Sequence, residues 1–276
     1  MSKPIVSIIL PVKDQEKLVG RSIQSVIDQT FKDWELFVVN DGSTDRTGEV
    51  VQGFAAKDRR IIYLNNGRNL GIPKSFNSAA RMAHGKYIGR LDSDDSWIGK
   101  DKLQKQVEFL DRHPDYVVTG GGMVVVDESG KEHYRYLKPE RDEELRRSAL
   151  VTSPISSSTF LGRADVILKS GLFDEKLNFN EDWDFFLKLG TMGKMYNFPE
   201  YFSYYTLTGR NRSSVFMRAH TIRGFEVLFR YRKQYPRFWQ SFFMHCAQYA
   251  YSFIPFSLRD KLHPALSRFK KLFAGA

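Results

Sequence analysis

A short acidic run, Asp92-Ser93-Asp94-Asp95, is the part of the sequence with the clearest potential for chemistry. Its carboxylates lie so close together that they repel one another unless a cation lies among them. Hard cations such as Mg²⁺ and Mn²⁺ take one or two carboxylates together with phosphate oxygens of a substrate. The run therefore predicts a metal-binding turn, and the alternative interpretation is a solvated turn or the N-cap of a helix.

Two further clusters place a carboxylate where it could bind a ligand or remove a proton. In Asn40-Asp41-Gly42-Ser43, an ionised Asp41 can accept a hydrogen bond from a ring N–H of a nucleobase, and Gly42 lets the backbone approach a ligand closely. In Asn180-Glu181-Asp182-Trp183-Asp184, the dipole of the following helix keeps a first-turn carboxylate ionised and able to act as a general base. Helix capping or an Asx turn accounts for either cluster as well, and Trp183 suits a sugar-stacking surface and the core equally.

The expected elements around these clusters alternate between strands and helices. Apolar runs and helical spacing predict strands at 5–10, 34–39, 60–64 and 86–91, and helices at 16–30, 45–56 and 73–84. Such alternation is typical of a doubly wound parallel sheet, in which ligands bind beyond the carboxyl ends of the strands. Asp41 and the run Asp92–Asp95 each follow an expected strand, so both should lie at one edge of the sheet. Gly85 is expected at the C-cap of the third helix.

The second half of the chain is less regular. A strand is expected at 116–126, a loop and a helix within the polar stretch 127–152, and helices at 164–170 and 182–189. The length of 276 residues suits one α/β domain with a smaller appendage.

The composition indicates a soluble protein of a reducing compartment. Hydrophobic residues make up 42% and charged residues 27%, enough of each for a sizeable core and a polar surface. The single cysteine, Cys246, excludes a disulfide within a monomer and is interpreted as a small core residue. The apolar run near Met1 ends at Pro11 and lacks the length and the cleavage site of a signal peptide. A cytoplasmic location is therefore expected.

Positive charge is concentrated towards the C-terminal end. Residues 218–276 hold eleven Lys or Arg and two acids, which gives +9 of the total net charge of +10. The aromatic stretch 238–256 has no charged residue, but its polar side chains argue against a membrane-spanning helix. A basic helix is expected at 262–273, with an apolar face of Leu262, Leu266, Phe269 and Phe273. Such a helix suits an anionic membrane surface, and the alternative is a helix pair packed on the domain.

Taken in order, these motifs resemble the family 2 glycosyltransferases, whose fold is called GT-A. The resemblance covers roughly residues 4–215. Its main segments are Val6-Ser7-Ile8-Ile9-Leu10-Pro11, Val39-Asn40-Asp41-Gly42-Ser43-Thr44-Asp45, Asn69-Leu70-Gly71, Leu91-Asp92-Ser93-Asp94-Asp95 and Glu181-Asp182-Trp183-Asp184. The resemblance implies a doubly wound, mostly parallel sheet with a Rossmann-like nucleotide-binding half. It also implies a transferase domain over 1–217 and a helical appendage over 218–276.

The resemblance further implies a nucleotide-diphosphate sugar as the donor. Asp41 would pair with a uracil or thymine ring, so a UDP- or dTDP-sugar is favoured. Pro11 would line the nucleoside pocket, and Asn69 is also expected in the donor site. Arg210 or Arg212 would reach the diphosphate, with Arg212 preferred.

The acidic clusters would supply the metal site and the base. Asp92 and Asp94 match the DxD motif, with Asp94 the better candidate for direct contact with Mn²⁺ or Mg²⁺ and Asp95 assisting. Asp182 would deprotonate the acceptor hydroxyl, with Glu181 beside it. This arrangement implies an inverting hexosyltransferase, which needs a base on one face of the anomeric carbon and a diphosphate on the other.

The same resemblance limits the range of products and partners. The Gln-x-x-Arg-Trp signature of processive synthases is absent from the sequence, so transfer of a single sugar is expected. The expected acceptor is a lipid-linked or cell-envelope glycan at the inner face of the cell membrane. A nucleotidyltransferase-like enzyme is the alternative, but Leu10-Pro11-Val12-Lys13-Asp14 lacks the Gly-rich phosphate loop it would need. No nucleic-acid partner is expected, because no RNA- or DNA-binding motif occurs.

Overall fold

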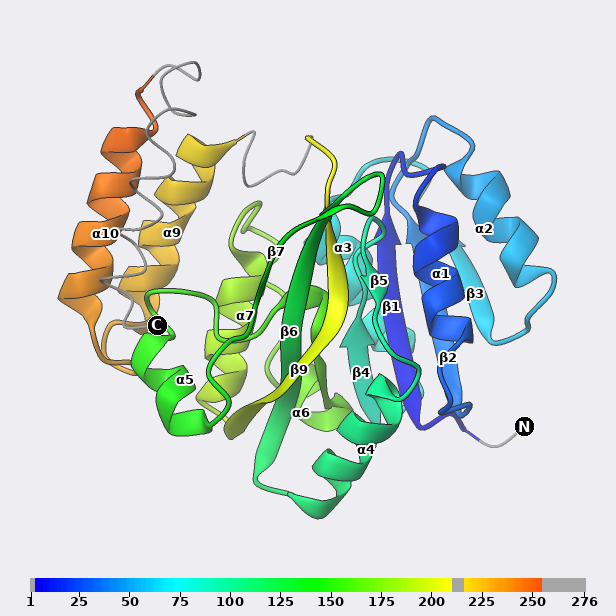
Figure 1. Ribbon diagram of the computed structural model, residues 1–276, viewed down its shortest axis with the longest axis horizontal. Helices are drawn as coiled ribbons and strands as arrows, with labels where there is room; N and C mark the ends of the chain where they lie inside the picture. The colour runs from blue at the N-terminus through cyan, green and yellow to red at the C-terminus, as the bar shows by residue number, and fades with distance from the viewer. Residues whose placement is uncertain (1–2, 210–215, 255–276) are drawn as a thin grey trace.

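The computed structural model describes residues 3–209 and 216–254, and Figure 1 shows them as one sheet flanked by helices. Its first part consists of four parallel strands: β1 Val6–Val12, β2 Trp34–Asn40, β3 Ile61–Asn65 and β4 Tyr87–Arg90. Their spatial order is β3-β2-β1-β4, so the strand order reverses at β1. Sheets of this kind bind ligands beside that reversal, here at the carboxyl ends of β1 and β4.

The second part of the sheet adds antiparallel pairs. Its strands are β5 Ser96–Trp97, β6 Tyr116–Asp127, β7 Glu132–Tyr136, β8 Leu161–Arg163 and β9 Lys194–Leu207. Strand β8 runs antiparallel to both β4 and β6, whereas β6 and β9 are parallel. The described residues thus form one nine-stranded mixed sheet, and the α/β fold class predicted from the sequence is confirmed.

The sequence pattern predicts β6 but not the four strands around it. Strands β5 and β8 have only two and three residues, too few for a periodic signal. Strand β7 is an exposed edge strand of charged and aromatic residues that pairs with β6 alone. Strand β9 contains Pro199 and has irregular burial, so its composition resembles a loop.

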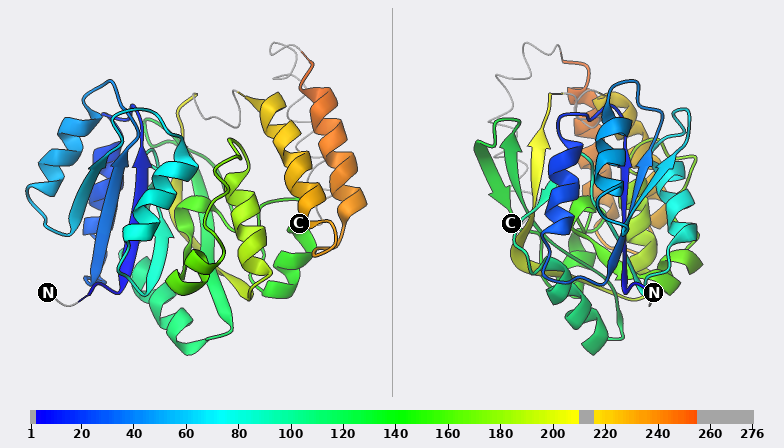
Figure 2. Two further views of the ribbon diagram at one scale, coloured as in Figure 1. Left: turned by 180° about the vertical axis from the view of Figure 1, so that it is seen from behind. Right: turned by 90° about the vertical axis from the view of Figure 1, so that its right-hand side faces the viewer.

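Helices cover both faces of the sheet, as Figure 2 shows. Helices α1 Val19–Ile27, α2 Thr47–Ala55 and α4 Lys102–Arg112 pack against one face. Helices α3 Ile72–Met82, α5 Asp142–Ser148, α6 Ala164–Lys169 and α7 Glu181–Gly190 pack against the other. The alternation within β1 explains this division, because Ile8 and Leu10 point to the first face and Ile9 to the second.

The prediction that Gly85 caps a helix is wrong. Helix α3 ends at Met82, and its C-cap is Ala83 in an extended conformation. Gly85 instead lies against β1, where a Cβ atom would be 2.6 Å from the backbone nitrogen of Ser7. Its N–H donates a hydrogen bond of 2.8 Å to the Ser7 hydroxyl. The missing side chain therefore allows the chain to enter β4 directly beside β1.

The helices α9 Met217–Tyr231 and α10 Phe238–Tyr251 pack beside each other at one end of the molecule (Figure 1). Helix α9 buries Val227 and Leu228 in the same core cluster as α7. Helix α10 leaves Trp239 and Phe243 exposed at 67% and 65%. Within residues 3–209 and 216–254, no helix has the length and apolar character needed to cross a membrane. The predicted basic helix at 262–273 lies outside the described residues.

Candidate active site

The carboxyl ends of β1, β2 and β4 bring the first predicted site residues to one edge of the sheet. Val12 pairs with Asn40, so β1 and β2 end at the same level, whereas β4 ends at Arg90 opposite Ile9, and the Leu91 N–H donates 3.1 Å to the Ile9 carbonyl. Pro11 is buried within β1. Asp41 follows β2 directly, as predicted from the spacing of the acidic clusters.

The Asp41 carboxylate organises the loop that follows β3. One oxygen accepts hydrogen bonds from the Asn66 side chain at 2.9 Å and the Leu70 N–H at 2.7 Å. The other oxygen accepts the Gly71 N–H at 2.8 Å. Asp41 is 5% exposed, so these N–H groups replace the water that a carboxylate would otherwise need.

The predicted donor residue Asn69 lies in this same loop. Its side-chain oxygen accepts the Gly71 N–H at 3.1 Å, and the residue is exposed. Gly42 makes the loop possible, because it has a φ of 72° and a Cβ there would lie 2.6 Å from the Arg68 carbonyl carbon. Gly42 was expected to let the backbone approach a ligand closely. In the structure, it is the Arg68–Asn69 backbone that lies close to Gly42.

The three carboxylates of the acidic turn occupy different environments. Asp95 is 1% exposed and accepts hydrogen bonds from the Ser158 hydroxyl and, at 3.1 Å, from the Thr206 N–H. Asp92 accepts a hydrogen bond of 2.7 Å from the Arg90 Nε atom. Asp94 is half-buried, and no cation in the described part of the chain forms an ion pair with its side chain.

This environment disfavours the ionised form of two of the three carboxyl groups. Burial and the neighbouring charge of Asp92 raise the pKa of Asp94 to about 6. Burial, followed by the charges of Asp94 and Asp92, raises the pKa of Asp95 well above its usual range. Holding such carboxylates ionised costs free energy that a bound cation would offset.

The donor set fits a hard divalent cation shared with a substrate. Carboxylate oxygens are the ligands that Mg²⁺ and Mn²⁺ take. In residues 3–209 and 216–254, no three His, Cys, Asp or Glu side chains converge on a single metal position. The protein would thus supply one or two carboxylates, and phosphate oxygens would complete the coordination.

Two consecutive serines join the acidic turn to Asp182. Ser157 and Ser158 belong to the short 3₁₀ helix η1 Ser157–Thr159. The Ser157 hydroxyl donates 2.9 Å to one oxygen of Asp182, and Ser158 donates to Asp95. The Asp92 N–H also donates to the Ser158 hydroxyl at 3.3 Å. The run Ser156-Ser157-Ser158 was the only signal in the sequence for this connection.

Arg90 is a buried cation at the centre of the site that the sequence pattern did not reveal. It is 4% exposed and forms an ion pair of 2.5 Å with Asp92 through Nη2. Burial lowers the pKa of Arg90, but the charges of Asp92, Glu181 and Asp182 outweigh that effect and raise it. Its Nη1 atom has no hydrogen-bond partner among the described residues. Arg90 therefore lies between the acidic turn and the start of α7.

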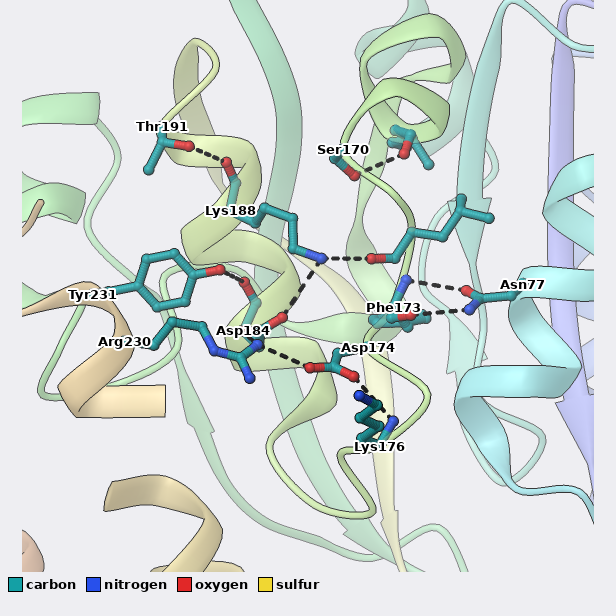
Figure 3. A network of polar contacts seen from close by, with 12 residues as sticks. Asn77, Ser170, Phe173, Asp174, Lys176, Asp184, Lys188, Thr191, Arg230 and Tyr231 are labelled. Atoms are coloured by element: carbon teal, nitrogen blue, oxygen red, sulfur yellow. Dashed lines mark hydrogen bonds and ion pairs between the residues drawn. The ribbon is translucent and has the colours of Figure 1, made fainter. Parts of the chain in front are cut away.

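The third acidic residue of α7, Asp184, belongs to an ion-pair network (Figure 3). Its side chain is fully buried, lies 2.7 Å from Arg230 Nη1 and 3.7 Å from Lys188 Nζ. The Tyr231 hydroxyl donates 3.2 Å to the Asp184 carbonyl. This network fastens α9 to α7 and fixes the helix whose first turn carries Asp182.

Trp183 belongs to the core. It is 5% exposed, and its indole N–H donates 2.6 Å to the Ala149 carbonyl. Its ring stacks on His245 of α10 with 5.5 Å between the centroids. The sugar-stacking alternative for Trp183 is therefore wrong.

A sequence profile for the family described as Glycosyl transferase family 2 matches residues 7–171, more than half of the chain. The chain belongs to glycosyl transferase family 2. Membership confirms the resemblance seen in the motifs and decides against the nucleotidyltransferase alternative.

Relatives of this glycosyltransferase carry the same activity in their names. An uncharacterized glycosyltransferase of Haemophilus influenzae is 30% identical over 226 residues, 77% of this chain and 68% of that protein. TuaG of Bacillus subtilis, named for teichuronic acid biosynthesis, is 37% identical over 126 residues, 45% of this chain and 50% of that protein.

Two solved structures share the fold of the glycosyltransferase. TarS 1–349 of S. aureus in complex with UDP-GlcNAc has a TM-score of 0.61 at 24% identity, covering 73% of this chain and 58% of that one. The mannosyltransferase PcManGT from Pyrobaculum calidifontis, in complex with GDP-Man and Mn²⁺, has a TM-score of 0.63 at 18% identity. That alignment covers 82% of this chain and 65% of the mannosyltransferase.

Most of the predicted site residues of the glycosyltransferase lie in its described part. Asp92, Asp95 and Asp182 are joined through η1, and Asp94 lies in the turn between Asp92 and Asp95. Pro11, Asp41 and Asn69 lie along the neighbouring strand ends and the loop after β3. Arg212 and the alternative Arg210 lie outside the described residues.

Proposed function

We propose that this family 2 glycosyltransferase moves one sugar, with inversion, from a nucleotide-diphosphate sugar to a hydroxyl of a lipid-linked or cell-envelope glycan. The observation that carries the proposal is the connection through η1. Ser157 holds the carboxylate at the start of α7, and Ser158 holds the acidic turn at the end of β4. A base and a diphosphate-binding turn are thereby built into one site.

The donor nucleotide would bind along the ends of β1 and β2. Asp41 has one oxygen with a single hydrogen bond, to Gly71, which leaves room to accept a ring N–H of uracil or thymine. Pro11 and Asn69 flank this position, and Arg212 would reach the diphosphate. We therefore favour a UDP- or dTDP-sugar. The UDP-GlcNAc bound to TarS is in line with this choice, while the GDP-Man bound to PcManGT is the contrasting case.

Asp94 is the side chain proposed to contact Mn²⁺ or Mg²⁺. Asp92 is held by Arg90 and Asp95 by Ser158, so Asp94 has the carboxylate most available to a ligand. A bound divalent cation would neutralise charge on the leaving diphosphate. Asp92 and Asp95 would fix the orientation of the turn and add to its negative field.

Asp182 is proposed to take the proton of the acceptor hydroxyl. It lies in the first turn of α7, and the Ser157 hydroxyl sets the direction of its carboxylate. As the acceptor oxygen bonds to the anomeric carbon, the bond from that carbon to the diphosphate oxygen breaks, and the proton moves to Asp182. Glu181, beside it and 8% exposed, would contribute charge to the site.

The acceptor is proposed to lie at the inner face of the cell membrane. Residues 218–276 would form an appended segment, packed through α9 on the transferase domain of residues 1–217. The exposed Trp239 and Phe243 and the basic composition of this segment suit an anionic lipid surface. The name of TuaG, for teichuronic acid biosynthesis, supports an envelope glycan as the class of acceptor.

Calorimetric titration of UDP with and without Mn²⁺ tests the donor site. Metal-dependent binding that Asp94→Ala abolishes is the expected result. Absence of binding by UDP, dTDP and GDP under every metal condition would overturn the proposal.

Sedimentation with vesicles containing phosphatidylglycerol tests the membrane contact. Trp239→Ser with Phe243→Ser should reduce the bound fraction, whereas Leu168→Ser, at an exposed residue of α6, should not. Substitutions are preferable to deletion of 218–276, because α9 contributes to the core. Equal sedimentation of both variants would contradict the contact.

A further inference from the structure

We infer that the site-facing side of β7, with Lys138 after it, binds the acceptor and is built for a sugar that carries a carboxylate or phosphate. The inference rests on the proposed function, since it assigns the acceptor to the same site as Asp182. Neither β7 nor Lys138 was among the residues predicted from the sequence.

Tyrosines of β7 and β9 share one face of the sheet. Tyr136 lies opposite Met123, and Tyr134 lies opposite Val125, in the antiparallel ladder of β6 and β7. Val125 is also the neighbour of Tyr205 in the parallel ladder of β6 and β9. Side chains alternate between faces along a strand, so the three tyrosines project to the same side.

This tyrosine face looks towards the acidic residues of the site. Burial raises the pKa of Tyr136 to about 12, and the charges of Asp95 and Asp182 add to the rise. Burial and the charges of Asp95 and Asp94 likewise raise the pKa of Tyr205. Both hydroxyls therefore stay protonated at neutral pH and can donate hydrogen bonds to a sugar.

Two of the rings form an open platform. The centroids of Tyr134 and Tyr136 are 6.4 Å apart, with an interplanar angle of 31°. Tyr134 is 57% exposed although it lies in a strand, so its ring is available to a ligand. Aromatic rings of this kind suit the apolar face of a pyranose.

Lys138 places a cation beside this platform. Its ammonium donates 2.5 Å to the Ser153 carbonyl and lies 5.9 Å from the Tyr136 ring centroid. An ammonium has three donor positions, and no carboxylate of the described residues forms an ion pair with Lys138. Burial lowers the pKa of Lys138 to about 8, against the opposing effect of the Asp182 charge, so Lys138 is charged at neutral pH and an anionic partner would stabilise that charge.

A short segment links Lys138 to the proposed base. Ser153 contacts Lys138, and Ser157, four positions later, contacts Asp182. The Asn197 amide holds the residues that follow Lys138 and Ser153 together. It donates hydrogen bonds to the carbonyls of Pro139 at 3.1 Å and Pro154 at 3.0 Å. Lys138 is thus held at a fixed place with respect to Asp182.

The position favours the acceptor over the donor. The donor residues lie on β1 and β2, whereas β7 pairs with β6, beyond β4 and β8 in the strand order (Figure 1). A sugar stacked on Tyr134 and Tyr136 would present its anionic group to Lys138 and a hydroxyl to Asp182. The chemical class is therefore an acidic glycan, with either a uronate or a sugar phosphate as the charged unit.

Binding of three matched probes tests the inference. Octyl glucoside, octyl glucuronide and the octyl phosphodiester of glucose are titrated into the full chain saturated with UDP and Mn²⁺. The wild type should bind at least one acidic probe about tenfold more tightly than the neutral probe. The stronger of the two acidic probes identifies the uronate or the phosphate as the charged unit.

The variants separate the cation from the platform. Lys138→Met should abolish the preference for the acidic probe, Lys138→Arg should retain it, and Lys131→Met, an exposed lysine before β7, should leave it unchanged. Tyr134→Ala should weaken all three probes to a similar extent, about tenfold. Equal binding of neutral and acidic probes by the wild type, or an unchanged preference in Lys138→Met, would overturn the inference.

Titration of UDP distinguishes failure of this inference from failure of the proposed function. Lys138→Met should bind UDP with Mn²⁺ as the wild type does, which also shows that the variant is folded. If the wild type binds UDP but does not discriminate between the probes, the acceptor assignment alone is wrong. If the wild type does not bind UDP, the proposed function is wrong.

Discussion

The carboxylate of Asp184 in α7 and that of Asp94 in the acidic turn differ in how they are neutralised. Asp184 is fully buried but has Arg230 at 2.7 Å and Lys188 at 3.7 Å (Figure 3). Asp94, in the acidic turn, has no ion-pair partner among the described residues, and its pKa is raised to about 6. Asp184 is neutralised by cations of the chain, whereas the acidic turn has a paired cation at Asp92 and, among the described residues, none at Asp94.

The difference indicates what each carboxylate is for. A buried carboxylate with its own cations holds helices together, because removing either partner leaves a charge without compensation. A carboxylate held near other carboxylates without a cation lowers stability, and such a cost is typical of a site that awaits a ligand. Substitutions at the two carboxylates should therefore affect different properties.

Asp94→Asn should give the largest effect, on activity. The substitution replaces the carboxylate proposed to contact the metal by an amide. It should lower kcat/KM by about 10³-fold or more, which corresponds to roughly 4 kcal/mol of transition-state stabilisation. Initial rates with a UDP-sugar and Mn²⁺ measure this loss. A loss of less than tenfold would place the metal contact elsewhere in the turn.

The same variant should be more stable than the wild type at neutral pH. Because the folded-state pKa of Asp94 is raised, its ionisation opposes folding. That cost is absent below the unfolded pKa of about 4 and fully present above the folded value of about 6. Without metal, Asp94→Asn should therefore gain at most about 3 kcal/mol at pH 7 to 8, and the gain should vanish as the pH falls from 6 to 4. Urea unfolding over this range measures it, with the exposed Asp165→Asn as control.

Arg230→Met should show the opposite behaviour. It leaves Asp184 fully buried with Lys188 alone and also removes the 3.0 Å contact to Asp174, so we expect a loss of about 3 kcal/mol in unfolding free energy. The kcat/KM of the folded fraction should change by no more than about twofold. Arg223→Met, which breaks an exposed pair with Glu226, should cost within about 0.5 kcal/mol. A large activity loss in folded Arg230→Met would mean that α9 contributes directly to the site.

Arg90→Met should lower activity and strengthen Mn²⁺ binding, because Arg90 is the buried cation that forms an ion pair with the acidic turn in the described part of the chain. Loss of its bond to Asp92 should lower kcat by about 10²-fold. Without this positive charge, the turn should also reach half-saturation at a several-fold lower Mn²⁺ concentration. Arg90→Lys should return the half-saturating Mn²⁺ concentration to the wild-type value, because the positive charge is kept. It should recover little of kcat, because lysine lacks the bidentate geometry. If Arg90→Met needed a higher Mn²⁺ concentration for half-saturation than the wild type, this assignment would be wrong.

The sequence predicted the elements that produce the first half of the site. The strands expected at 34–39 and 86–91, each followed by an acidic cluster, indicated a parallel sheet and placed Asp41 and Asp92 at one edge. This was possible because buried parallel strands have a distinctive composition and their carboxyl ends coincide. The placement of the first half of the sheet is accordingly confirmed.

The sequence did not reveal contacts that depend on distant segments. Arg90 lies within a predicted strand, and only the fold places it near Asp182, 92 positions further on. The orientation of Trp183 depends on Ala149 and His245, which no local pattern connects to it. Strand β7 was hidden because an exposed edge strand of charged and aromatic residues has no apolar run.

The smallest effects are expected from substitutions of the two serines that join the halves of the site. One substitution should lower kcat, and the other should weaken UDP binding. Ser157→Ala removes the 2.9 Å bond to Asp182, so kcat should fall about tenfold, consistent with one hydrogen bond to a charged group, while UDP binding stays unchanged. Ser158→Ala frees Asp95 and should instead weaken UDP binding with Mn²⁺ several-fold. Steady-state kinetics gives kcat and calorimetry gives the dissociation constant of UDP for each of the two variants. If Ser157→Ala weakens UDP binding as much as Ser158→Ala does, η1 supports the site as a whole and does not orient the base separately. A split between the two would mean that neighbouring hydroxyls of one turn position the base and the donor turn independently.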